Sequence, residues 1–97
     1  MSLVVVARWR TTEESQEHIA ALLPDFAATA LATPGCLSFE AVRSESDPRS
    51  FVLVEHYTGH AAFGLRRSSS DYQRMLDDVF LPNLVLREHD TYVPLTR

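Results

Sequence analysis

Residues 36–57 read CLSFEAVRSESDPRSFVLVEHY, two apolar, β-prone runs separated by a charged segment. Asp47-Pro48 in that segment is typical of a turn. The stretch therefore predicts a hairpin with strands over residues 36–44 and 50–57. Because the tip of this hairpin is charged, we expect it to be exposed to water.

The sequence before the hairpin predicts a strand and then a helix. Residues 3–7 form a short run rich in β-branched side chains, typical of a strand covered on both faces. Thr11-x-x-Glu14 then matches a capping box at a helix start. Pro24 predicts a kink or a division of that helix. Apolar residues recur at helical spacing along it and form one stripe: Ile19, Leu22, Leu23, Phe26 and Ala30.

The sequence after the hairpin predicts two helical stretches and a last strand. Residues 61–67 form the first, brief helix. Ser70-x-x-Gln73 matches a second capping box, Pro82-Asn83 ends the helix that follows, and residues 86–93 are expected to form a partly exposed strand. The second helix carries apolar residues at helical spacing: Tyr72, Met75, Leu76, Val79 and Phe80.

The order strand, helix, strand, strand, helix, strand predicts an α+β, ferredoxin-like βαββαβ fold, with residues 1–97 as a single domain. In this fold a four-stranded antiparallel sheet carries its helices on one face. The hairpin is apolar on both faces, with Phe51 and Leu53 on one and Val52 and Val54 on the other. The face without helices needs a cover, and a second copy of the chain is the simplest one, so we expect a homodimer.

Composition argues against several classes of partner. The formal net charge is −4, which argues against nucleic acid, because binding to its phosphate backbone relies on clustered cations. No apolar run reaches the length of a membrane span, so no membrane association is expected. Cys36 is the only cysteine, which allows no intrachain disulfide and suits a reducing, cytoplasmic location.

The sequence predicts neither a metal site nor a nucleotide cofactor. His56-x-x-x-His60 beside Glu55 has the residue types of zinc ligands, but it spans a strand end and a turn instead of one helix. Strand alternation also places Glu55 and Tyr57 on one face and His56 on the other, so these three side chains do not form one site. With three glycines in all, the chain has no phosphate-binding loop.

Aromatic residues and one arginine are the candidates for a binding pocket. Trp9, Phe63 and Tyr72 could line an apolar space between the sheet and the helices, where flat aromatic ligands would stack. Filling of the core is the alternative role for these rings. Arg66 could stabilise the negative end of the brief helix, or it could face inward and supply a cation to an anionic or enolate-like substrate.

The segment TPGCLSFEAVRSESDPRSFVLVEHYTGHAAF, residues 33–63, resembles the antibiotic biosynthesis monooxygenase family. Members of that family are small dimeric α+β barrel domains, and the similarity extends over nearly the whole chain. The resemblance therefore implies the fold and a homodimer. It is less specific for the reaction, because the family includes cofactor-free quinone-forming monooxygenases, haem-degrading enzymes and isomerases.

Several positions differ from the family's pattern. Tyr57 stands where relatives often have the tryptophan of a Glu-x-Trp motif, and Arg66 and Asp71 stand where many relatives carry histidines. Haem-degrading relatives use an asparagine on the first strand, a tryptophan in the short helix and a haem-ligating histidine on the next helix. This chain has Ala7, Arg66 and the histidine-free residues 71–80 there, so haem degradation is not expected and no cofactor is predicted.

The residues and the resemblance together favour a cofactor-independent monooxygenase that oxidises a polycyclic aromatic or quinol-like substrate with dioxygen. In that chemistry the substrate phenol loses a proton and the resulting carbanion reduces dioxygen, while the protein supplies a dry pocket and an acid/base partner. Tyr57 and His60 are the candidates for proton handling, and Arg66 is the candidate for stabilising the oxyanion. A non-catalytic dimer that binds a small ligand and an isomerase of a small keto compound remain as alternatives.

Overall fold

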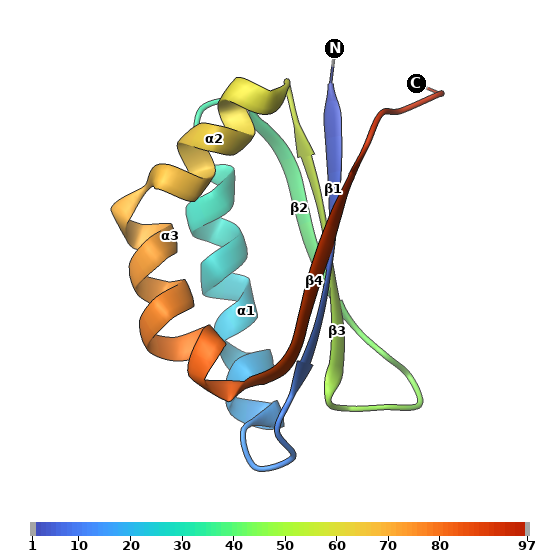
Figure 1. Cartoon of the computed structure of the whole chain (residues 1–97), viewed down its shortest axis with the longest axis vertical. Coiled ribbons are helices and arrows are strands. Elements are labelled where there is room, and N and C mark those ends of the chain that lie inside the picture. The colour runs from blue at the N-terminus through green and yellow to red at the C-terminus, as the bar shows by residue number, and fades with distance from the viewer. Residues whose placement is uncertain (1, 97) are drawn as a thin grey trace.

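A four-stranded antiparallel sheet forms one layer of the molecule, and the helices form a second layer on one face of that sheet (Figure 1). The computed structural model describes residues 2–96. The strands lie in the order β2-β3-β1-β4, with the bounds β1 Leu3–Thr11, β2 Cys36–Arg43, β3 Ser50–Tyr57 and β4 Leu84–Tyr92. This arrangement confirms the predicted α+β, ferredoxin-like fold.

Helices make the two long connections between strands. α1 (Gln16–Leu31) joins β1 to β2, and α2 (His60–Ser68) followed by α3 (Ser70–Met75) joins β3 to β4. After α3 the chain continues through a π-helical turn at Leu76–Phe80 and a 3-10 turn at Leu81–Asn83. The second predicted helix thus keeps α-helical geometry only as far as Met75.

The first predicted capping box is wrong, because Thr11 belongs to the sheet. β1 extends through this residue, whose backbone N–H donates to the carbonyl of Arg49 at 2.9 Å. α1 begins only at Gln16, after Ser15. The hydroxyl groups of Thr12 and Ser15 lie 2.6 Å apart and tie the connection between the strand and the helix.

The second predicted capping box is also displaced, since Ser69 and not Ser70 caps α3. The backbone of Ser69 is extended (φ −67°, ψ 141°), and its hydroxyl accepts a hydrogen bond from the N–H of Tyr72 at 3.2 Å. Pro24 does not divide α1, which is continuous. Pro24 is exposed while Leu23 and Phe26 are buried, so core contacts hold the helix together across the missing hydrogen bond.

The covered face of the sheet packs against α1 to form the main core. Trp9 of β1 and Phe51 and Leu53 of β3 are buried on this face. The Phe26 ring of α1 lies 4.8 Å from the Phe80 ring and 5.8 Å from the Trp9 ring, measured between centroids. These aromatic contacts anchor α1 and fix one wall of the space between the two layers.

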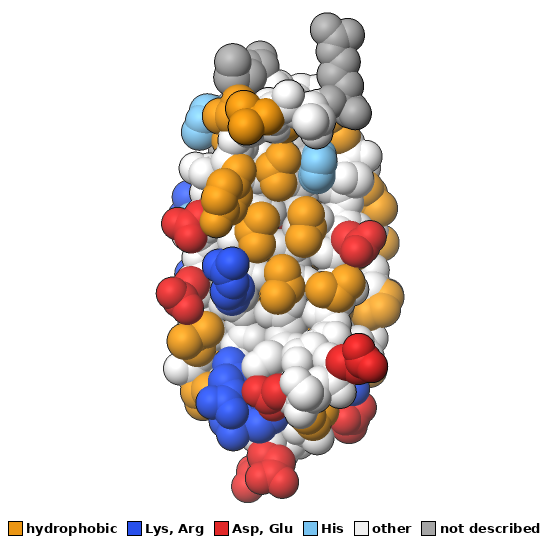
Figure 2. All heavy atoms as spheres, turned by 90° about the vertical axis from the view of Figure 1, so that its right-hand side faces the viewer, with side chains coloured by type: hydrophobic (Ala, Val, Ile, Leu, Met, Phe, Trp, Pro, Cys, Tyr) orange, Lys and Arg blue, Asp and Glu red, His pale blue; other side chains and the backbone are white. Residues whose placement is uncertain are grey.

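The opposite face of the sheet has no cover within residues 2–96 (Figure 1). Its side chains alternate with the buried ones along β1 and β3, and the register places Val4 beside His56 and Val6 beside Val54. Figure 2 shows hydrophobic side chains gathered in the middle of this face, with charged side chains toward its rim. The sheet is therefore apolar on both faces, as the sequence predicts.

Candidate functional site

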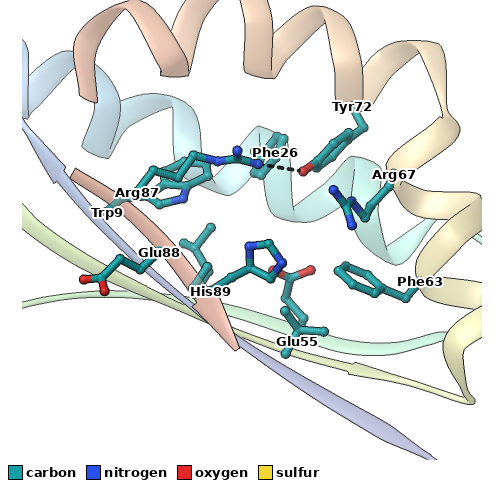
Figure 3. Close-up of a pocket in the computed structure, with 12 residues that line it drawn as sticks. Trp9, Phe26, Glu55, Phe63, Arg67, Tyr72, Arg87, Glu88 and His89 are labelled. Atoms are coloured by element: carbon teal, nitrogen blue, oxygen red, sulfur yellow. Dashed lines mark hydrogen bonds between the residues drawn. The ribbon is translucent and has the colours of Figure 1, made fainter. Parts of the chain in front are cut away.

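A small cavity lies between the covered face of the sheet and the helices, beside β4 (Figure 3). β1, β3 and β4 line it on one side, and α1, α2 and α3 line it on the other. Its volume is about 30 Å³, enough for on the order of one or two water molecules. Pockets for drug-sized ligands measure roughly 300–1,000 Å³, so a larger ligand must displace side chains at the mouth of this cavity.

Aromatic rings form much of the cavity wall. The structure brings Trp9, Phe63 and Tyr72 together around this space. Phe26 joins them from α1, and its ring stacks against that of Tyr72 with the centroids 5.8 Å apart. A flat aromatic ligand that entered here would meet ring surfaces from several elements.

Glu55 places a buried carboxylate in the cavity lining. Its exposed fraction is 8%, and the buried Tyr57 hydroxyl donates a hydrogen bond to its Oε1. Burial raises the pKa of the Glu55 carboxyl, while the hydrogen bond from Tyr57 and the charge of Arg66 limit the rise. Burial and the neighbouring Glu55 raise the pKa of Tyr57, so the phenol stays neutral and remains a donor at neutral pH. This pair can hold or accept a proton at the cavity.

Arg66 is buried against the aromatic wall. Its exposed fraction is 1%, and its guanidinium carbon lies 4.6 Å from the centroid of the Phe26 ring and 4.8 Å from that of Tyr72. Nη2 donates to the Phe26 carbonyl at 3.3 Å, whereas Nε and Nη1 have no hydrogen-bond partner among the described residues. Burial lowers the pKa of Arg66, and Tyr57 and Glu55 counteract that shift. Of the two orientations considered from sequence, the inward one is observed.

Neither His60 nor Tyr57 lines the cavity, but Tyr57 is hydrogen-bonded to Glu55, which does. His60 is exposed at the start of α2 and is not part of the cavity lining. Tyr57 also lies outside the lining and contacts the cavity through Glu55, which the sequence analysis did not select. One signal could have identified Glu55: it shares the inward face of a strand with buried Leu53, and a buried carboxylate needs a specific partner.

Three basic side chains surround the mouth of the cavity: Arg67 from α2, and Arg87 and His89 from β4 (Figure 3). The Arg67 guanidinium carbon lies 5.5 Å from the centroid of the Phe63 ring. Arg87 Nη2 donates a long hydrogen bond of 3.4 Å to the Tyr72 hydroxyl. The sequence does not single out these three residues. Arg67 is one of two basic residues in the last turn of α2, where a cation is common, and the face on which Arg87 and His89 lie depends on how β4 pairs with β1.

The described residues contain no assembled metal site. Within residues 2–96, no three His, Cys, Asp or Glu side chains gather so that they could hold a metal ion. His56 faces the open side of the sheet and Glu55 faces the cavity, which separates the zinc-ligand types that occur at the end of the hairpin. In the same part of the chain, no helix is both long and apolar enough to span a membrane.

Solved structures share this fold over nearly the full chain. The Rv0793 protein of Mycobacterium tuberculosis is 24% identical with a TM-score of 0.88, and the match covers 100% of this chain and 98% of that one. A Nitrosomonas europaea protein assigned by name to the antibiotic biosynthesis monooxygenases is 19% identical with a TM-score of 0.90, over 97% and 90% of the two chains. A variant of SnoaB, a cofactor-independent oxygenase from Streptomyces nogalater, is 16% identical with a TM-score of 0.86, over 99% and 95%.

Comparison with protein families says more about the identity of the chain than its similarity in fold to these solved structures. No curated protein matches the sequence. The family model described as antibiotic biosynthesis monooxygenase matches residues 2–78, which include the aromatic wall of the cavity as well as Glu55 and Tyr57. Because the match extends over most of the chain, the protein belongs to the antibiotic biosynthesis monooxygenase family.

Proposed function

We propose that the protein is a cofactor-independent monooxygenase that oxidises a polycyclic aromatic or quinol-like compound with dioxygen. Membership of the antibiotic biosynthesis monooxygenase family supports an oxygenase, and one structural neighbour, SnoaB, is described as a cofactor-independent oxygenase. The observation that carries the proposal is Glu55, a buried carboxylate with a raised pKa in a cavity walled by aromatic rings.

Glu55 is the proposed proton acceptor. Its Oε1 accepts the hydrogen bond from Tyr57, and its second oxygen has no protein partner within residues 2–96. A raised pKa brings the carboxyl closer to the pKa of a substrate phenol, which makes proton transfer less unfavourable. Tyr57 fixes the orientation of the carboxylate and is therefore a positioning residue in this scheme.

The deprotonated substrate then supplies the electrons. Its carbanion form reduces dioxygen, a carbon–oxygen bond forms, and loss of water from the resulting peroxide leaves a quinone. One oxygen atom stays in the product and the other leaves as water. Arg66 is not part of the cavity lining, but its buried charge is held against two rings of that lining, Phe26 and Tyr72, and is proposed to stabilise the substrate oxyanion from there. His60 is left out of this scheme because it is exposed and outside the cavity lining.

Substrate entry must enlarge the cavity. A space of about 30 Å³ is too small for a polycyclic compound. The side chains at its mouth, Arg67, Arg87 and His89, are exposed and can rotate outward. The proposed scheme therefore includes displacement of Arg87 from the Tyr72 hydroxyl when substrate binds.

The proposed functional unit is a homodimer. The open face of the sheet is rich in hydrophobic side chains (Figure 2), and an apolar face of this kind is stabilised when a second copy covers it. The cavity lies on the other side of the sheet, beside the helices. Packing of two copies through their open faces leaves the mouth of each cavity free for substrate.

The Glu55–Tyr57 pair also favours one alternative, an isomerase of a small keto compound. A carboxylate in contact with a phenol can take a proton from one carbon and return it to another without dioxygen. The small volume of the cavity suits a small substrate as well. The two activities differ in their need for oxygen, which makes them separable.

Oxygen uptake tests the proposal. The parent protein is mixed with a panel of anthrone and quinol compounds, and oxygen consumption is followed together with product absorbance. We expect uptake that Glu55→Gln lowers by on the order of 10²–10⁴-fold, while Glu45→Gln, at the exposed hairpin tip, keeps the parent rate. Product formation without oxygen uptake would favour the isomerase, and binding without turnover would favour a non-catalytic dimer.

A further inference from the structure

Arg67 and Arg87 approach the mouth of the cavity from different walls. Arg67 extends from α2 over the Phe63 ring, and Arg87 extends from β4 to the Tyr72 hydroxyl (Figure 3). Both side chains are exposed. Within residues 2–96 neither arginine forms a salt bridge, since the ion pairs found there involve Arg10 and Arg43.

Exposed arginines without an acidic partner are common on protein surfaces, but these two share one opening. Each is held by an aromatic residue of the cavity lining, Phe63 or Tyr72. The chain has 13 acidic residues and 9 arginines, yet the carboxylate of Glu88 at this opening points away from the cavity (Figure 3). The mouth is therefore a cationic region of an acidic protein.

We propose that Arg67 and Arg87 bind a carboxylate group of the substrate at the mouth of the cavity. The planar guanidinium group donates two parallel hydrogen bonds to a carboxylate, a geometry that a neutral substituent cannot match. The substrate class is then a hydroxylated aromatic acid and not a neutral polycyclic compound. This inference rests on the proposed function for the aromatic part of the substrate.

The charges along the cavity would orient such a ligand. Among the lining residues, Glu55 is buried inside the cavity and Arg67 and Arg87 are exposed at its mouth, while the buried Arg66 lies outside the lining against Phe26 and Tyr72. A carboxylate is repelled by the ionised form of Glu55 and attracted by Arg67 and Arg87. The acidic end of the substrate stays at the mouth, and the hydroxylated ring enters beside Trp9 with its phenol toward Glu55.

Trp9 provides a direct measure of binding, because it is the only tryptophan and it lines the cavity. The parent protein is titrated with hydroxynaphthoate and with the matching hydroxynaphthamide, and both the quenching of Trp9 fluorescence and the heat of binding are recorded. We expect the acid to bind about tenfold more tightly than the amide. High salt should reduce this preference, since the arginines are exposed to solvent.

Substitution of the arginines tests whether their positive charge, and not the shape of the cavity, causes the preference for the acid. Arg67→Gln and Arg87→Gln should each weaken binding of the acid by about three- to tenfold and leave binding of the amide unchanged. The double variant should lose the preference for the acid. Arg74→Gln is the matched control, because Arg74 is exposed on α3 and is not part of the cavity lining. Melting curves establish that each variant is folded.

Three results would overturn this inference: equal binding of the acid and the amide, no binding of either probe, or an equal loss in Arg74→Gln. Oxygen uptake tests the proposed oxygenase activity independently of these binding measurements. If the protein prefers the acid but consumes no oxygen, the carboxylate site is supported and the proposed reaction is contradicted. If the protein oxidises neutral quinols and binds the acid no better than the amide, the proposed reaction is supported and the carboxylate site is contradicted.

Discussion

Glu55 and Tyr57 occupy inward positions on β3, and their burial affects charge and hydrogen bonding differently. The carboxyl loses hydration, which favours its neutral form and raises its pKa. The phenol keeps its proton and continues to donate to Glu55. The burial that raises the pKa of Glu55, and so makes its carboxylate a stronger base, therefore also destabilises the ionised form of Glu55 in the folded protein.

The free energy of unfolding should fall with rising pH through Glu55. Because its folded-state pKa is raised above the ordinary 4.5, the folded protein binds this proton more tightly than the unfolded chain. The contribution is full below pH 4.5 and is lost as the pH rises through the folded-state pKa. Urea unfolding of the parent and of Glu55→Gln over a pH series measures it, and the parent should lose stability relative to the variant in that window. A difference that stays constant with pH would contradict the expectation.

Arg66→Met should slow the proposed oxidation without unfolding the protein. Nε and Nη1 are buried without hydrogen-bond partners within residues 2–96, and an unsatisfied buried polar group costs about 1–3 kcal/mol, so the melting temperature should stay equal or rise. Loss of a charge that stabilises the transition state should cost on the order of 10²–10³ in rate. Oxygen uptake and melting are measured together, with Arg74→Met as the control. An unchanged rate would remove Arg66 from the mechanism, and a large drop in melting temperature would make its role structural.

Among the elements, the hairpin follows the sequence most closely. β3 has its predicted bounds, Ser50–Tyr57. The alternation of buried and partly buried side chains marks the strand itself, and the Asp47-Pro48 turn fixes where it begins. Helix starts are less constrained by local pattern. Ser69 and Ser70 have the same chemistry, and only the extended backbone between α2 and α3 decides that Ser69 is the cap.

The candidate site was less predictable than the fold, since it depends on contacts between distant segments. Trp9 and Tyr72 could be selected from sequence because large rings near a core tend to line the space between layers. Arg87 could not, because it faces the cavity only when β4 pairs with β1 in the register that sets it opposite Trp9. A polar edge strand carries no local signal for that register.

The connection between α1 and β2 depends on the absence of a side chain at Gly35. Its φ is +86°, and a Cβ there would lie 2.5 Å from Cβ of Ala62 and 2.8 Å from Oγ1 of Thr58. Gly35→Ala should therefore destabilise the protein by more than the roughly 1–2 kcal/mol of the backbone term alone, because α2 must shift as well. Gly64→Ala lies inside α2, where, apart from the chain neighbours and the surrounding helix backbone, no atom of residues 2–96 comes within 4 Å of the added Cβ, so this substitution should stabilise the protein by roughly 0.5–1 kcal/mol. Urea unfolding compares the two variants, and effects of the same sign would contradict this account.

For the molecule as a whole, the open face of the sheet should govern assembly. Sedimentation at micromolar concentration should give about twice the chain mass of 10.9 kDa. Val54→Arg, beside Val6 on the open face, should give a folded monomer, because it places a charge in the proposed interface. Leu65→Arg is the control, since Leu65 is exposed on α2, and it should remain a dimer. A parent protein that sediments as a monomer would refute the proposed assembly.

The position of β1 in the sheet has a consequence for the protein during its synthesis. β1 is the first strand to be made, and it lies between β3 and β4, the last strand. The sheet therefore cannot close before residues 84–92 have left the ribosome. Until then β1 has an unpaired edge, and its apolar run is open to pairing with other nascent chains. The interval between completion of β3 and release of β4 is thus when this chain is most exposed to misassembly.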